Sequence, residues 1–187
     1  MRIPLLAICL FISSSVMANP LTYEVDGTHA YAIFSIDHKG IAPNFGRFNV
    51  IKGAVVYGTD TKKNSIKLEI DPKSVDTGHK KRDSHLRGPD FFDAKQFPSI
   101  TFVSSQWKKT GPKNYEVTGK LTFHGVTKTM TVKVEKTGSG KDRRGNDRLG
   151  LVSHFEIDRT AFGVTYSPKG LGKIVKVTLS METVHKN

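Results

Sequence analysis

Cysteine is almost absent from the chain, since Cys9 is the only one among 187 residues. It lies within residues 1–18, which have an early arginine, an apolar stretch and a small residue, Ala18, where a secretory signal peptide would be cleaved. Cleavage near Ala18 would remove Cys9, so we expect a single domain over 19–187 without disulfide or thiolate chemistry. These features predict a periplasmic or secreted protein.

Long apolar runs and two common catalytic motifs are also absent. After Ala18 no stretch approaches the roughly 18 to 20 apolar residues that span a bilayer, which predicts a soluble mature protein. No Gly-x-Ser-x-Gly elbow is present to expose a nucleophile, and the glycines around Lys141 lack the spacing of a phosphate-binding loop. We therefore do not expect an enzyme. A hydrolase that uses His38 or His124 with an aspartate is a weaker alternative.

Histidine is frequent enough to raise the question of a metal site. His79, Asp83 and His85 lie close together in a segment predicted to be helical, but the spacing fixes no third ligand. The alternative is a solvated helix face. We predict no metal and no cofactor.

Negative charge is scarce relative to positive charge. The chain has 29 Lys and Arg against 17 Asp and Glu, a formal charge of +12. The basic residues are spread along the chain without an aromatic-interleaved stripe, so no nucleic-acid partner is predicted. Transient contact with an anionic membrane surface stays open as a partner, as does a homodimer.

Apolar residues alternate with polar ones almost everywhere, which is typical of half-buried strands. The pattern predicts strands over 30–38, 45–57, 65–71, 99–107, 149–158 and 172–184, and a hairpin that joins 115–123 to 126–136. The glycine-punctuated segment 137–148 is interpreted as a loop. Short strands separated by turns predict an all-β fold, an antiparallel sandwich or barrel.

One short helix is expected after Thr77, which can cap it, and Gly88-Pro89 ends it. The connection that follows contains Phe91, Phe92 and Phe97 in a polar context. Each exposed ring would cost roughly 1.5 to 3 kcal/mol, so these side chains should cover one end of the sheet.

Several short motifs occur in a characteristic order. They include Arg82-Asp-x-His-Leu86, Asp90-Phe-Phe-Asp93, Gly119-x-Leu-Thr-Phe-His-Gly-Val-Thr127 and Ile157-Asp-Arg159. In this combination the chain resembles the YceI-like family of exported polyisoprenoid-binding proteins, over about residues 20–184. The basic segment 141–148 is not part of the pattern.

The resemblance implies an extended antiparallel lipocalin-like β-barrel that holds a long-chain lipid or isoprenoid, without catalysis, cofactor or metal. Barrels of about eight strands are either filled by their own side chains or hold one small ligand. The alternative is therefore a packed structural or stress-response protein, in which the same residues form an ordinary core. The residues expected to line a pocket are Phe34, Ile36, Phe48, Val50, Leu68, Ile70, Phe102, Leu121, Phe123 and Phe155, with Phe91, Phe92, Phe162 and Tyr166 at its mouth or cover.

Overall fold

The computed structural model describes residues 19–186, so the predicted signal peptide at 1–18 lies outside the described residues. The strands are β1 (Leu21–His38), β2 (Ala42–Phe48), β3 (Ile51–Tyr57), β4 (Ser65–Ile70), β5 (Val75–Asp76), β6 (Ile100–Lys109), β7 (Asn114–Phe123), β8 (Val126–Lys141), β9 (Asp147–Asp158) and β10 (Leu171–His185). The helices are α1 (Lys80–Arg87) and the 3-10 turns η1 (Thr61–Lys63), η2 (Pro72–Ser74) and η3 (Arg159–Phe162).

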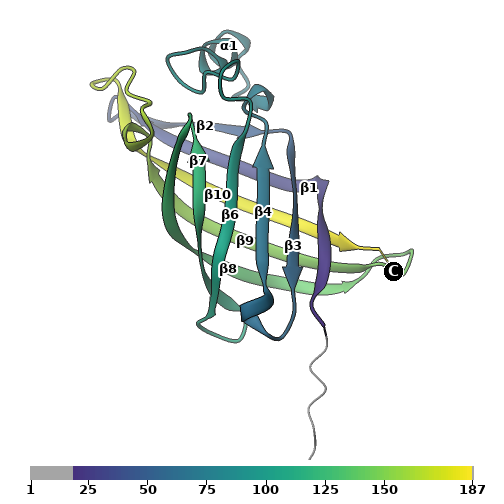
Figure 1. Cartoon of the computed structure of the whole chain (residues 1–187). Coiled ribbons are helices and arrows are strands. Elements are labelled where there is room, and N and C mark those ends of the chain that lie inside the picture. The colour runs from purple at the N-terminus through teal and green to yellow at the C-terminus, as the bar shows by residue number, and fades with distance from the viewer. Residues whose placement is uncertain (1–18, 187) are drawn as a thin grey trace, which may run out of the picture.

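The strands close into an antiparallel barrel (Figure 1). β1 pairs with β10 from Glu24 opposite Val184 to His38 opposite Leu171, and this pairing joins the two ends of the strand order. The other edge of β1 pairs first with β3 and then with β2. Eight strands complete the ring, while β2 and β5 extend it at one end. The predicted lipocalin-like barrel with one short helix is confirmed.

Three predicted segment boundaries are wrong. The strand predicted over 30–38 is only the second half of β1, which begins at Leu21. The predicted strand over 45–57 is two strands, β2 and β3, separated by Asn49 and Val50. The predicted loop over 137–148 is mostly strand, since β8 continues to Lys141 and β9 begins at Asp147. The two strands pair as far as Lys141 opposite Asp147, because Asp142 accepts hydrogen bonds from the backbone N–H groups of Arg144 and Asn146 and confines the turn to the residues between the strands.

Helix α1 lies over one end of the barrel (Figure 1), which we call the α1 end. Its N-cap is His79, whose Nδ1 accepts a hydrogen bond from the backbone N–H of Arg82 at 3.2 Å, so the predicted cap Thr77 is wrong. The helix ends at Gly88 as predicted. Within residues 19–186 no helix has both the length and the apolar character needed to cross a bilayer.

Aromatic side chains fill the barrel end opposite α1. The Trp107 ring lies 5.4 Å from Tyr115 and 6.3 Å from Tyr57, and the hydroxyls of the two tyrosines are 2.7 Å apart. Burial and the neighbouring phenol raise the pKa of Tyr57, so its hydroxyl stays neutral and shares a hydrogen bond with Tyr115. This plug closes one end of the interior.

A charged network ties the β8–β9 turn to β1 near the plugged end. The register of β1 shifts between Val25 and Ala30, and Asp26 lies in this irregular stretch. The Arg148 guanidinium donates to Asp26 at 2.6 Å and to Asp142 at 3.2 Å. Hydrogen bonds from Thr28, Arg148 and His29 hold the pKa of Asp26 well below its usual range. Bonds from Asn146 and the turn backbone lower the pKa of Asp142 to about 2.

Replacing Arg148 with alanine should lower the melting temperature at pH 7 by about 2–4 °C, the effect of roughly 1 kcal/mol in a domain of this size. The pKa values of both carboxyls are depressed in the folded protein. Their contribution to the free energy of unfolding is therefore complete above the pKa of an unfolded aspartate, near 3.9, and is lost as the pH falls. The difference in melting temperature between the unmodified protein and the Arg148→Ala variant should therefore shrink from about pH 4 to pH 2 in calorimetric scans. Arg143→Ala makes the same charge change on the same turn, and an equal deficit in that variant would contradict the network.

Candidate functional site

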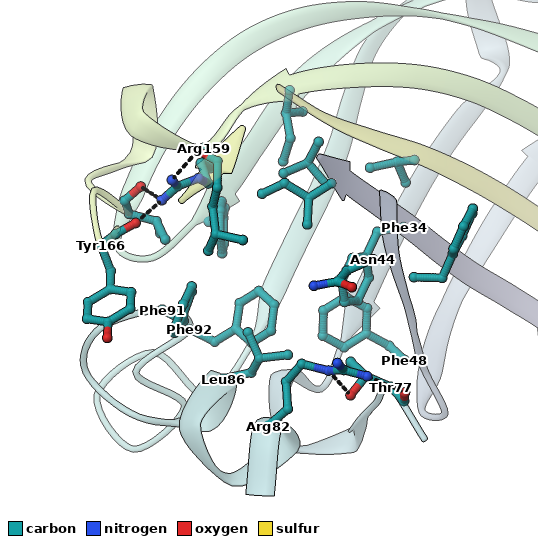
Figure 2. Close-up of a pocket in the computed structure, with 18 of the residues that line it drawn as sticks. Phe34, Asn44, Phe48, Thr77, Arg82, Leu86, Phe91, Phe92, Arg159 and Tyr166 are labelled. Atoms are coloured by element: carbon teal, nitrogen blue, oxygen red, sulfur yellow. Dashed lines mark hydrogen bonds between the residues drawn. The ribbon is translucent and has the colours of Figure 1, made fainter. Parts of the chain in front are cut away.

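A cavity of about 400 Å³ lies inside the barrel at the α1 end (Figure 2). Its wall combines strands from opposite sides of the barrel with the connection that follows α1. Ten of the residues predicted from the sequence border it: Phe34, Ile36, Phe48, Ile70, Phe91, Phe92, Leu121, Phe123, Phe155 and Tyr166. The polar side chains of the wall include Asn44, Thr77, Arg82 and His85.

Strand alternation builds the side of the cavity formed by β1. Ala32, Phe34 and Ile36 share one face of the strand and all border the cavity. Gly46 is the partner of Phe34 on β2, and a Cβ atom at Gly46 would overlap the Phe34 ring. The glycine therefore leaves the space that this ring occupies.

Phenylalanines from the connection after α1 cover the cavity. The Phe92 ring lies 5.3 Å from Phe48, 6.4 Å from Phe34 and 6.0 Å from Phe123, so it bridges opposite walls. Phe91 packs 5.1 Å from the exposed ring of Tyr166. Both rings pack over one end of the sheet, where the sequence predicted an aromatic cover.

A hydrogen-bond relay fixes the start of α1 beside the opening. Arg82 Nε donates to the Thr77 hydroxyl at 2.7 Å, and this hydroxyl donates to Asp83 at 2.5 Å. Arg82 also donates to the Thr77 carbonyl oxygen at 2.8 Å (Figure 2). Arg82 remains exposed while Asp83 is buried. The relay places a cationic side chain at the border of an apolar cavity.

Arg159 holds the other side of the opening and was missed as a site residue. It is buried, and it donates to the carbonyl oxygens of Val164, Tyr166, Leu171 and Gly172 at 2.8 to 3.3 Å. Burial lowers its pKa, and the nearby Asp158 opposes this effect. Arg159 thus fixes the connection between η3 and β10, which carries Tyr166.

A second cavity of about 80 Å³ lies deeper in the barrel. It shares wall residues with the larger cavity, among them Ile70, Leu121 and Phe155. The predicted residues Leu68 and Phe102 border only this smaller cavity. A smaller unfilled space therefore lies next to the large cavity, deeper in the barrel.

Two predicted residues border neither cavity. Val50 is 39% exposed, because it lies in the break between β2 and β3 where strand alternation is interrupted. Phe162 is buried, but it lies in η3 and packs against Phe123 at 5.5 Å as part of the surrounding core. The sequence prediction missed Val175 and Val177, although their alternation on the strand predicted over 172–184 could have identified them.

The histidines considered for metal binding or hydrolysis have separate local roles. His79 caps α1, and His85 Nε2 contacts Asp90 at 2.9 Å. His38 borders the cavity, whereas His124 contacts the Phe162 carbonyl oxygen at 3.2 Å in the β7–β8 turn. Within residues 19–186 no three His, Cys, Asp or Glu side chains are grouped so that they could hold a metal ion.

Comparison with known proteins identifies relatives across nearly the whole chain. A UPF0312 protein from Yersinia pestis is 34% identical over 176 residues, which cover 94% of this chain and 91% of that protein. The crystal structure of BcnA from Burkholderia cenocepacia is similar with a TM-score of 0.77 and 28% identity. That match covers 84% of this chain and 98% of BcnA.

A polyisoprenoid binding domain from Saccharophagus degradans has the same fold, with a TM-score of 0.69 and 17% identity. The match covers 89% of this chain and 99% of that domain. The model of the YceI-like domain matches residues 23–183. Because this match includes the barrel and every wall of the cavity, the chain belongs to the YceI-like family.

Proposed function

We propose that the protein is a periplasmic or secreted carrier that holds a long-chain amphiphile, such as a polyisoprenoid, a quinone-like lipid or a fatty-acyl lipid, inside the barrel. The role would be transport, storage or sequestration. The observation that carries the proposal is the apolar cavity of about 400 Å³ at the α1 end. Its volume is within the range of roughly 300–1,000 Å³ typical of small-molecule sites.

The lining of the cavity favours a hydrocarbon tail over a polar ligand. The inner wall consists of aromatic and aliphatic side chains, and the exposed polar side chains Lys39, Arg82 and His85 are at its border. Burial of a methylene group contributes about 0.8 kcal/mol, so ten methylenes would contribute about 8 kcal/mol before ordering costs. A tail could therefore bind without directional contacts, with its head group near the exposed border.

The relatives and the N-terminal sequence give further support. A neighbour with the same fold is described as a polyisoprenoid binding domain. The signal-like composition of residues 1–18 supports export. A fully packed structural barrel, the alternative considered from the sequence, does not account for an unfilled interior with an exposed polar border.

The protein recovered after export should carry a lipid. Native mass spectrometry of gently purified protein should show a bound mass, and solvent extraction should release a molecule with a long apolar tail. The mass of the denatured chain should correspond to an N-terminus near residue 19. A protein that is consistently empty and takes up neither a dansyl-labelled fatty acid nor an anthraniloyl-labelled prenol would refute the carrier function.

Narrowing the cavity should weaken probe uptake without unfolding the barrel. Val177 borders both cavities and faces Phe34 across the β1–β10 pair, so Val177→Phe places a ring in empty space. Affinity for the labelled fatty acid should fall by about tenfold or more, while the melting temperature should stay equal or rise. The matched control is Val103→Phe, because Val103 is 45% exposed on β6. Equal affinities in the two variants would place the probe outside the cavity.

A further inference from the structure

Two connected loops form the rim beside the cavity opening. One is the turn between β1 and β2, and the other joins η3 to β10. The backbone N–H of Lys39 in the first loop donates to the Gly170 carbonyl oxygen in the second at 3.1 Å. Both loops lie at the α1 end of the barrel (Figure 1). This hydrogen bond links the two loops next to the opening.

These loops and the start of β2 expose three large apolar side chains, Ile41, Phe45 and Tyr166, which we call the apolar rim. Ile41 is 82% exposed, Phe45 is 61% exposed and Tyr166 is 45% exposed. Phe45 and Tyr166 also border the cavity, so the apolar rim is continuous with its interior. Exposed apolar surface gathered at one place marks an interaction site more often than scattered single residues do.

Positive charge accompanies the apolar rim. Lys39 and Lys169 are exposed on the same two loops. The nearby carboxylates already have partners, since Asp37 accepts from the backbone of the β1–β2 turn at 2.8 Å and Asp90 contacts His85 at 2.9 Å. Among the described residues 19–186, neither lysine forms an ion pair with a carboxylate, so the surface around the opening presents apolar groups between two unpaired cations. This combination is typical of proteins that bind at the interface of an anionic bilayer.

We infer that the apolar rim docks on an anionic phospholipid bilayer, with Ile41 inserted at the boundary between head groups and acyl chains. Lys39 and Lys169 then lie at the level of the lipid phosphates. The inference rests on the proposed function, because docking would turn the opening toward the membrane. A lipid tail could then pass between the bilayer and the cavity without crossing water.

The charges favour a bilayer over a second copy of the chain as the occupant of this surface. Two copies packed rim to rim would bring Lys39 and Lys169 against the same lysines of the other copy. Phosphate groups of an anionic bilayer would compensate these charges instead. The bilayer also matches the continuity between the apolar rim and an apolar cavity.

Vesicle flotation of the exported, signal-free protein tests the docking surface. We expect the protein to float with vesicles of phosphatidylglycerol and phosphatidylcholine in equal parts, and much less with phosphatidylcholine alone. The double variant Ile41→Ser with Lys169→Gln should lose about tenfold or more of the partitioning, because it removes one inserted side chain and one cation. Neither residue borders the cavity, so affinity for the labelled fatty acid in solution should stay unchanged.

The matched control, Val103→Ser with Lys120→Gln, also replaces one exposed aliphatic residue by serine and one lysine by glutamine, at positions paired between β6 and β7. It should float like the unmodified protein. Equal flotation of both double variants, or no preference for anionic vesicles, would overturn the docking inference. A dimer in sedimentation velocity that only the rim variant dissociates would overturn it in favour of a second copy. If the unmodified protein did not bind the labelled fatty acid in solution, that result would instead refute the carrier function.

Discussion

The pairing of β1 with β10 is the constraint on which the cavity depends. It joins residues near the two ends of the chain over most of both strands and turns an open sheet into a ring. A closed ring of eight strands has a single interior, and strand alternation sends every second side chain into it. Whether that interior is full then depends on the size of those side chains at each level. In this chain they fill the end opposite α1 and leave the α1 end partly empty.

The two barrel ends differ in the kind of residue that closes them. At the plugged end, Tyr57, Trp107 and Tyr115 are rigid rings whose polar atoms bond to one another or to neighbouring side chains, which makes their burial favourable. At the α1 end the closing elements are loops, fixed by Arg159 and by the relay through Thr77. These hydrogen bonds position the loops without filling the space beneath them. Because the larger cavity lies at the α1 end, a tail that binds in it would enter from that end.

Alternation is a local signal, so it predicted the strands and most of the inward residues. It left a sandwich and a barrel open, and the barrel was implied by the family resemblance. The sequence also located the end of α1 at Gly88 and the aromatic cover at Phe91 and Phe92. It wrongly assigned Val50 to the cavity wall. The sequence pattern predicted one continuous strand over 45–57, whereas β2 ends at Phe48 and β3 begins at Ile51. The cap at His79 was also missed. Threonine is a preferred helix cap, but the Thr77 hydroxyl is already hydrogen-bonded to Arg82 and Asp83. Cavity volume depends on all walls together and is not encoded in any one segment.

The character of the cavity wall bears on how such a protein could distinguish ligands. Hydrocarbon tails that differ by one methylene differ by only about 0.8 kcal/mol in burial, so an apolar wall selects weakly among them. Polar groups select more strongly, because a buried polar group without a partner costs about 1–3 kcal/mol. In this barrel Asn44 and Thr77 are partly exposed and Arg82 is exposed, and Arg82 is already hydrogen-bonded to Thr77. Selection by head group would therefore be modest, and access at the opening, more than fit within the wall, would determine which amphiphile is held.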